Sequence, residues 1–229
     1  MTKCVHCLTP TDKITKDHIF PKSWYPDNTP EEVQRWTIPA CKRCNEELGK
    51  IEEDLFMRLG MCIPPDRIAG SGISKKVLES FGIGVALDSK EAAHRGAKLK
   101  QILAEMQPYS GRKESILPGL EPAEGHHPSN WREIPIPITL LRLQEKIVRG
   151  LEYRLGGLRY VGDDYEIETY NVYENSAAWV DDLISQGYMV DRGPGFQVAR
   201  IMSPEQEVLY RIRIWDSFTI HASIMKKKP

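Results

Sequence analysis

The sequence predicts an α+β protein, in which a cysteine-rich N-terminal module precedes a partly helical linking region and a small domain with an antiparallel sheet. Three observations support this prediction. Two Cys-x-x-Cys pairs stand at residues 4–7 and 41–44, an apolar stripe of helical period covers 140–155, and short alternating apolar segments recur in 165–222. The boundaries that we expect are 1–65 for the module, 66–130 for the linking region, 131–225 for the second domain and 226–229 for a basic tail.

Composition excludes a strongly basic nucleic-acid-binding protein, because 31 basic and 32 acidic residues leave a net charge of −1. Any nucleic-acid surface must therefore be local, and the window 74–113, with 8 basic and 4 acidic residues, is the best candidate.

No apolar run approaches the roughly 20 residues of a membrane span, and the first residues have no apolar stretch of the signal-peptide kind. We expect a cytoplasmic protein that does not associate with membranes and whose thiols stay reduced.

Four of the five cysteines fall in the two Cys-x-x-Cys pairs. A two-residue loop between cysteines lets both thiolates face one tetrahedral ion, so Cys4, Cys7, Cys41 and Cys44 are expected to hold a structural Zn²⁺. Cys62 is left over and is expected to be a small buried hydrophobe.

The first module should contain a zinc knuckle at residues 1–9, an extended segment from Thr15 to Ser23, and a loop at 26–35. A helix is predicted from near Cys44 to Gly60, since apolar residues follow one another at helical spacing there.

In the linking region, residues 74–81 have the pattern of a short helix, and Ser89 is a suitable N-cap for a second helix that ends near Met106. Residues 108–130 are rich in Pro and Gly, which favours loops or edge strands.

The second domain should begin with the helix 140–155, which Gly156-Gly157 stops. Further predicted elements are a strand at 165–173, a helix at 177–184, and strands at 196–202, 208–214 and 218–222.

On the helix 140–155, Arg142, Lys146 and Arg149 share one face. That face could follow a phosphate backbone, but Glu145 and Glu152 alternate with these cations, so a solvated, salt-bridged face is the preferred interpretation.

Three motifs of the first module resemble the zinc-containing HNH endonucleases, in the variant whose last motif residue is Asn. The motifs are Cys4-x-x-Cys7, the run Thr15-Lys16-Asp17-His18-Ile19-Phe20-Pro21-Lys22-Ser23, and Ile38-Pro39-Ala40-Cys41-Lys42-Arg43-Cys44-Asn45. The resemblance covers roughly residues 1–60 and implies a ββα-metal (treble-clef) fold. It implies a metal-dependent endonuclease that hydrolyses phosphodiester bonds, with DNA as the expected partner.

The resemblance implies His18 as the general base and Asp17 and Asn45 as ligands of a catalytic Mg²⁺ or Mn²⁺. The chemistry agrees, because an ordinary histidine is largely neutral at cellular pH and Asp17 offers a hard anionic oxygen. A further carboxylate ligand could come from Glu46, Glu47, Glu52 or Glu53, of which Glu52 lies two helical turns after Asn45 on the same helix face. One departure concerns the middle Asn of the family pattern, which orients the base: Trp36 stands near its usual position, and Asn28 is too far upstream.

Seven of the eight basic residues of the window 74–113 are the candidates for contact with DNA. They are Lys75, Lys76, Arg95, Lys98, Lys100, Arg112 and Lys113. The alternative function is a treble-clef zinc module without catalysis that binds nucleic acid or a protein partner, which the missing middle Asn and the near-neutral charge favour. A partner protein or a second copy of the chain fits either function.

Overall fold

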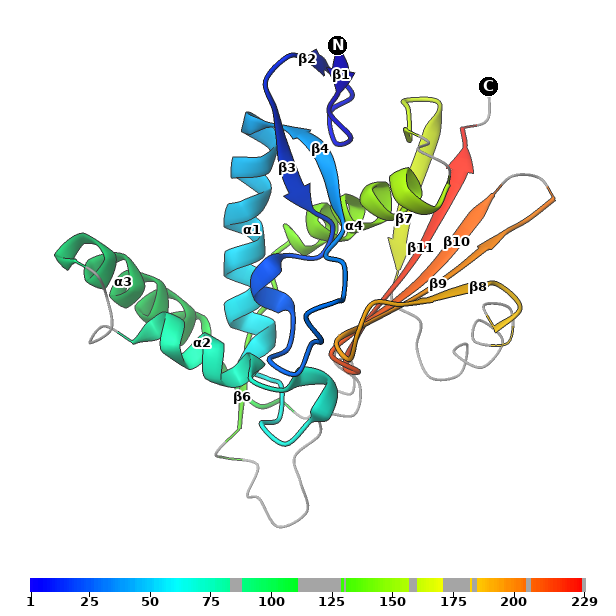
Figure 1. Ribbon diagram of the computed structural model, residues 1–229. Coiled ribbons are helices and arrows are strands. Elements are labelled where there is room, and N and C mark those ends of the chain that lie inside the picture. The colour runs from blue at the N-terminus through cyan, green and yellow to red at the C-terminus, as the bar shows by residue number, and fades with distance from the viewer. Residues whose placement is uncertain are drawn as a thin grey trace.

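A computed structural model of the chain describes residues 1–82, 88–110, 129, 131–156, 160–170, 182, 185–204 and 207–227. Within these residues the fold is α+β, as predicted, with four α-helices and an antiparallel sheet of five strands (Figure 1). No helix in the described part of the chain is long and apolar enough to cross a membrane.

The N-terminal part consists of two small hairpins and a long helix. The first hairpin pairs β1 (Thr2–Lys3) with β2 (Pro10–Thr11), and the second pairs β3 (Ile14–His18) with β4 (Thr37–Cys41). A short 3-10 helix, Lys22–Trp24, lies in the connection between β3 and β4. Helix α1 (Lys42–Gly60) follows β4 directly, so the second hairpin and the helix form one continuous unit.

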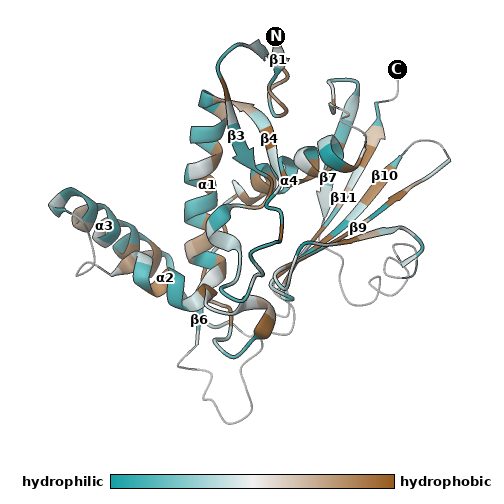
Figure 2. Cartoon of the chain, in the orientation of Figure 1, coloured by the Kyte–Doolittle hydropathy of each residue, from teal (hydrophilic) through white to brown (hydrophobic). Residues whose placement is uncertain are grey.

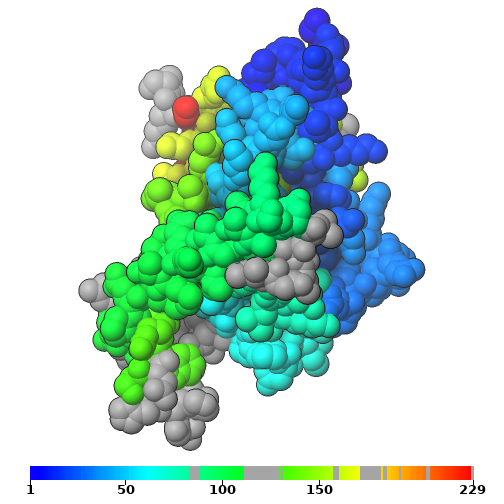
Figure 3. Space-filling model, turned by 90° about the vertical axis from the view of Figure 1, so that its left-hand side faces the viewer, coloured from blue at the N-terminus to red at the C-terminus, as the bar shows by residue number. Residues whose placement is uncertain are grey.

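Helices α2 (Ile73–Phe81) and α3 (Ser89–Glu105) lie on the far side of α1 from the large sheet (Figure 1). Asp88, not Ser89, is the N-cap of α3, and its carboxylate accepts a hydrogen bond from the backbone N–H of Glu91. Figure 2 shows α3 mostly in hydrophilic colours, and Ile102 is its one buried residue. In the space-filling view α3 (green) lies below the first turns of α1 (light blue) (Figure 3). The next segments pair as β5 (Gln107–Pro108) and β6 (Arg132–Glu133).

Helix α4 (Leu140–Leu155) has the predicted bounds and precedes the large sheet. The sheet order is β7-β11-β10-β9-β8, and every neighbouring pair is antiparallel. Its strands are β7 (Tyr165–Tyr170), β8 (Tyr188–Asp191), β9 (Phe196–Met202), β10 (Val208–Ile214) and β11 (Phe218–Lys226).

Two predictions in this part were wrong in detail. β8 was not expected, since Tyr188–Asp191 is short and lacks clear alternation, and it forms an edge by pairing with β9. The last strand runs on to Lys226, which pairs with Tyr165, so the predicted tail is partly a strand. The helix expected at 177–184 falls largely outside the described residues.

Helix α4 lies between α1 and the sheet and contacts both (Figure 1). Its predicted solvated face is therefore largely buried: Lys146 and Glu152 are inaccessible to solvent, while Arg149 is partly covered and Arg142 is exposed. Glu152 is stabilised by hydrogen bonds from Tyr210 and Arg200 of the sheet. The sequence pattern identified the helix, but a helix packed on two sides buries some of its charged residues as well.

One hydrophobic cluster joins the N-terminal hairpin and α1 to α2, α4 and the sheet. The Trp215 ring lies 4.9 Å from the Trp24 ring, and its indole N–H donates to the Trp24 carbonyl at 2.7 Å. The Phe20 and Phe196 rings stack at 4.3 Å. The core therefore runs across the boundaries expected at residues 65 and 130.

Candidate functional site

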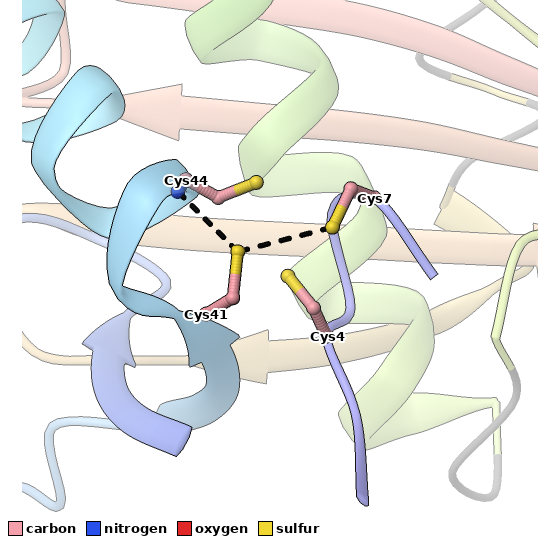
Figure 4. Close-up of side chains that lie close together, drawn as sticks. All are labelled: Cys4, Cys7, Cys41 and Cys44. Carbon is pink, nitrogen blue, oxygen red and sulfur yellow. Dashed lines mark hydrogen bonds between the residues drawn. The ribbon is translucent and has the colours of Figure 1, made fainter. Parts of the chain in front are cut away.

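The four predicted zinc ligands lie together at the N-terminal end of α1. Cys4 and Cys7 come from the turn between β1 and β2, while Cys41 ends β4 and Cys44 stands in the first turn of α1. Their sulfur atoms point toward one another (Figure 4) and all lie within 4.8 Å. The Cys7–Cys41 sulfur distance is 3.8 Å, about the edge of a tetrahedron with metal–sulfur bonds of roughly 2.3 Å. The cluster could hold a metal ion such as zinc.

Local backbone geometry builds this cluster. Leu8 adopts a left-handed conformation with φ of 59°, and its N–H bonds to the Cys4 carbonyl at 2.9 Å, which closes the loop of the first pair. Cys41 is the N-cap of α1, where its sulfur accepts a hydrogen bond from the Cys44 N–H at 3.5 Å. Burial raises the pKa of Cys4 and Cys44. Burial opposes ionisation of Cys7 too, but hydrogen bonds from Thr9 outweigh it and lower the pKa of Cys7 to about 6.

Asp17 is buried on β3, with both carboxylate oxygens engaged. His6 Nε2 lies 2.8 Å from Oδ2, and the Lys146 ammonium of α4 lies 2.9 Å from Oδ1. Burial would raise the pKa of Asp17, but the hydrogen bond from His6 and the charge of Lys146 outweigh it and hold that pKa below its ordinary value. Asp17 is therefore ionised at neutral pH.

Lys146 also bonds to the Glu52 carboxylate and, at 2.6 Å, to the His18 carbonyl. Burial raises the pKa of Glu52, although the charge of Lys146 opposes this shift. One ammonium from the second half of the chain thus connects three candidate residues of the first.

His18 is the last residue of β3, beside Asp17. Burial lowers its pKa, so the imidazole is neutral at pH 7. Its Nδ1 atom is buried and has no hydrogen-bond partner among the described residues. Trp36, near the position of the missing Asn, accepts a backbone hydrogen bond from Ile19 and stacks its ring on Arg192 at 4.0 Å. No described group replaces the Asn that would orient the imidazole.

Asn45 stands in the first turn of α1, directly after Cys44. Its amide nitrogen donates to the Thr15 hydroxyl at 3.0 Å, and that hydroxyl donates to the Ala40 carbonyl at 2.9 Å. The second hairpin therefore orients the Asn45 side chain.

Asp17, His18, Asn45 and Glu52 line one open cleft of about 1190 Å³. The sequence placed the first three in one site by resemblance, and the structure brings all four to the same cleft. Five cations share the lining with them: Lys16, Lys22, Arg35, Lys76 and Arg95. Lys16, Lys22 and Arg35 form no ion pair with any described residue, and the charges of Lys22 and Arg35 help to lower the pKa of His18.

The cations predicted to contact DNA have different surroundings. Lys76 and Arg95 line the cleft but pair with Asp27 at 2.7 Å and Glu91 at 2.6 Å. Lys98 pairs with Asp54, and exposed Lys75 lies 3.8 Å from Glu79. Lys100 is exposed, and Arg112 and Lys113 lie outside the described residues. Sequence reasoning missed Lys16, Lys22 and Arg35 as cleft cations, although Lys16 and Lys22 stand within the quoted motif.

Comparison with known proteins adds no relative: no family model, no curated protein and no solved structure matches this chain.

Proposed function

We propose that this chain is a metal-dependent endonuclease of HNH type, with a ββα-metal (treble-clef) nuclease core, that hydrolyses phosphodiester bonds in DNA. The observation that carries the proposal is the convergence of His18, Asp17 and Asn45 on one cleft beside a four-cysteine cluster. These residue types supply a base and hard oxygen ligands, which are what phosphodiester hydrolysis requires.

His18 acts as the general base in this proposal. The neutral imidazole takes a proton from a water molecule, the resulting hydroxide attacks phosphorus, and the bond from phosphorus to the leaving oxygen breaks. Burial favours the neutral imidazole. For Nε2 to accept the proton, Nδ1 must carry the ring hydrogen, and Nδ1 lacks an acceptor in the described structure.

Asp17 and Asn45 would hold the catalytic Mg²⁺ or Mn²⁺. Each Asp17 oxygen accepts one hydrogen bond and keeps a further lone pair. The amide nitrogen of Asn45 donates its hydrogen bond to Thr15, so the amide oxygen is available to coordinate an ion. The donor set thus fits a hard divalent cation. Such an ion would neutralise charge on the scissile phosphate and the leaving oxygen.

Lys16, Lys22 and Arg35 are the cations that would contact the DNA backbone, because no described carboxylate neutralises them. Zinc in the cysteine cluster would have a structural role, since it joins the first hairpin to the start of α1 and so positions Asn45. The part of the chain after residue 130 would select the substrate or bind a partner protein or a second copy.

A second function has two related observations in its favour. The unpaired Nδ1 of His18 and the missing middle Asn are what a treble-clef zinc module without catalysis would show. Such a module would bind nucleic acid or a protein through the same cleft without cutting.

The test is cleavage of supercoiled plasmid and single-stranded DNA with Mg²⁺, Mn²⁺ or EDTA, using protein whose zinc content is measured. We expect metal-dependent nicking that His18→Ala abolishes at unchanged zinc content. His94→Ala, at an exposed histidine of α3, is the matched control and should cleave normally. Salt-sensitive DNA binding without cleavage by the zinc-loaded wild type would support the second function instead.

A further inference from the structure

Lys146 places a buried ammonium directly behind three residues that line the candidate site. Its side chain is 0% exposed, and its nitrogen contacts Asp17 Oδ1 at 2.9 Å, the His18 carbonyl oxygen at 2.6 Å and Glu52. These three oxygens come from β3 and α1, whereas the lysine comes from α4. The three donors of an ammonium are thus matched by three acceptors.

This set of acceptors has the chemistry of a metal site. Two carboxylates and one backbone carbonyl are hard oxygen ligands of the kind that Mg²⁺, Mn²⁺ and Ca²⁺ select. They converge on a single nitrogen atom, as ligands converge on an ion. An ammonium is itself a compact point charge, so it can occupy such a position.

The other buried cation in the described part of the chain, Arg58 of α1, shows how this arrangement differs from an ordinary buried ion pair. Arg58 also contacts two carboxylates and one carbonyl, but through different atoms: Nε bonds Asp54 at 3.1 Å, while Nη1 bonds Glu105 at 2.7 Å and the Pro135 carbonyl at 2.9 Å. The planar guanidinium spreads its acceptors apart. Removing Arg58 would therefore not leave three oxygens around one point.

Burying an ammonium is unfavourable unless several partners compensate for its lost hydration. Helix α4 makes this possible because Gly150, one turn after Lys146, lets the helix approach the second hairpin closely. A Cβ atom at position 150 would lie 2.9 Å from the Ile19 side chain. The close approach brings the ammonium to the backbone of His18.

We propose that Asp17, Glu52 and the His18 carbonyl form a second cation site next to the catalytic one, and that Lys146 is its permanent occupant. Lys146 is then a positioning residue, which holds the Asp17 carboxylate and the backbone at His18 and places one positive charge behind the cleft wall. Without its ammonium, the same three oxygens bind a divalent ion.

The test counts Mn²⁺ ions bound to the zinc-loaded protein by electron paramagnetic resonance and follows thermal unfolding. Lys146→Met should bind one more Mn²⁺ per chain than the wild type, and Mn²⁺ should raise its Tm more than that of the wild type. Lys146→Met/Glu52→Gln should lose the additional ion. Arg58→Met, which also removes a buried cation next to two carboxylates, should gain none.

An unchanged Mn²⁺ count in folded Lys146→Met would overturn the proposal. If this variant does not fold with or without Mn²⁺, the proposal is tested on the wild-type protein by NMR. A buried Lys146 ammonium should give a slowly exchanging ¹⁵N–¹H signal that millimolar Mg²⁺ leaves in place, and loss of that signal on adding Mg²⁺ would show that the ion displaces the lysine.

This inference rests on the proposed function only in taking the cleft to be the nuclease site. The nuclease proposal and the second cation site can therefore fail separately. A wild type that neither cleaves DNA nor binds Mn²⁺ would count against the nuclease. A gain of one Mn²⁺ in Lys146→Met would still support the second cation site.

Discussion

Lys22 and Arg35 are exposed cations that form no ion pair with a described carboxylate. Their positive charges help to lower the pKa of His18. A cation that touches a phosphate releases counterions from DNA, so each contact adds to the salt dependence of binding. We predict that Lys22→Gln and Arg35→Gln each weaken DNA binding several-fold and each reduce the slope of log affinity against log salt by about one.

Lys75→Gln is the matched control, because Lys75 is also exposed but does not line the cleft and lies near Glu79. Fluorescence anisotropy with a labelled duplex at several salt concentrations measures all three variants. An equal loss in Lys75→Gln would mean that the cleft is not the DNA-binding surface.

At this scale the sequence predicted only part of the candidate site. The cysteines stand in pairs whose spacing predicts a metal site, and Asp17, His18 and Asn45 stand in motifs that were singled out by their resemblance to the HNH endonucleases. Lys146 has no such signal, because its role depends on contacts with residues far away in the chain. A lysine on an amphipathic helix looks the same whether it meets solvent or a buried carboxylate.

At the scale of elements, the contact between α4 and the second hairpin holds the site together. It depends on Gly150, since a methyl group there would meet Ile19 at 2.9 Å and Ile38 at 3.2 Å. The Ile38 contact is with the terminal Cδ1 atom, but the closer contact is with Cγ1 of Ile19, which is not a side-chain tip and belongs to a fully buried residue. The hairpin or the helix must therefore shift. The ammonium of Lys146 would shift with α4.

We predict that Gly150→Ala lowers the free energy of unfolding. Overpacking costs about 1–3 kcal/mol, and the better helix propensity of Ala returns about 0.5–1 kcal/mol, which leaves a net loss of roughly 1 kcal/mol. Urea unfolding followed by circular dichroism measures the change.

Gly49→Ala is the control for this prediction. Gly49 is also inside a helix, but nothing lies within 4 Å of a Cβ atom built there. The same substitution should therefore raise stability, by about 0.5–1 kcal/mol. A gain in both variants would show that α4 has room to accept a side chain at the hairpin.

Elements with a long, regular apolar pattern were predicted well. The bounds of α4, β9 and β10 agree with the prediction, and α1 begins two residues before Cys44. β8 could not be predicted, because an edge strand of four residues owes its conformation to pairing with β9. Local propensity carries little information about such a strand.

On the scale of the whole molecule, the hydrophobic core does not follow the division expected from the sequence. One cluster contains Trp24 and Phe56 from residues 1–65, Val77 and Ile102 from 66–130, and Trp215 from 131–225. Boundaries inferred from composition reflect changes in local pattern, whereas a shared core arises from packing between distant segments. The division into three regions stays a prediction until unfolding is measured.

We predict that the zinc-loaded chain unfolds in a single cooperative transition. Trp24 and Trp215 lie in contact across the first and last regions, so separating these regions exposes apolar surface in both. Thermal unfolding monitored by far-ultraviolet circular dichroism and by tryptophan fluorescence should give coincident curves, as two-state behaviour requires.

The fragment 1–65 with Zn²⁺ should stay unfolded, because Ile19, Trp24 and Leu55 would lose the neighbours that bury them. A folded fragment, with dispersed amide resonances, would instead establish residues 1–65 as an independent domain and would mean that α4 joins a preformed site.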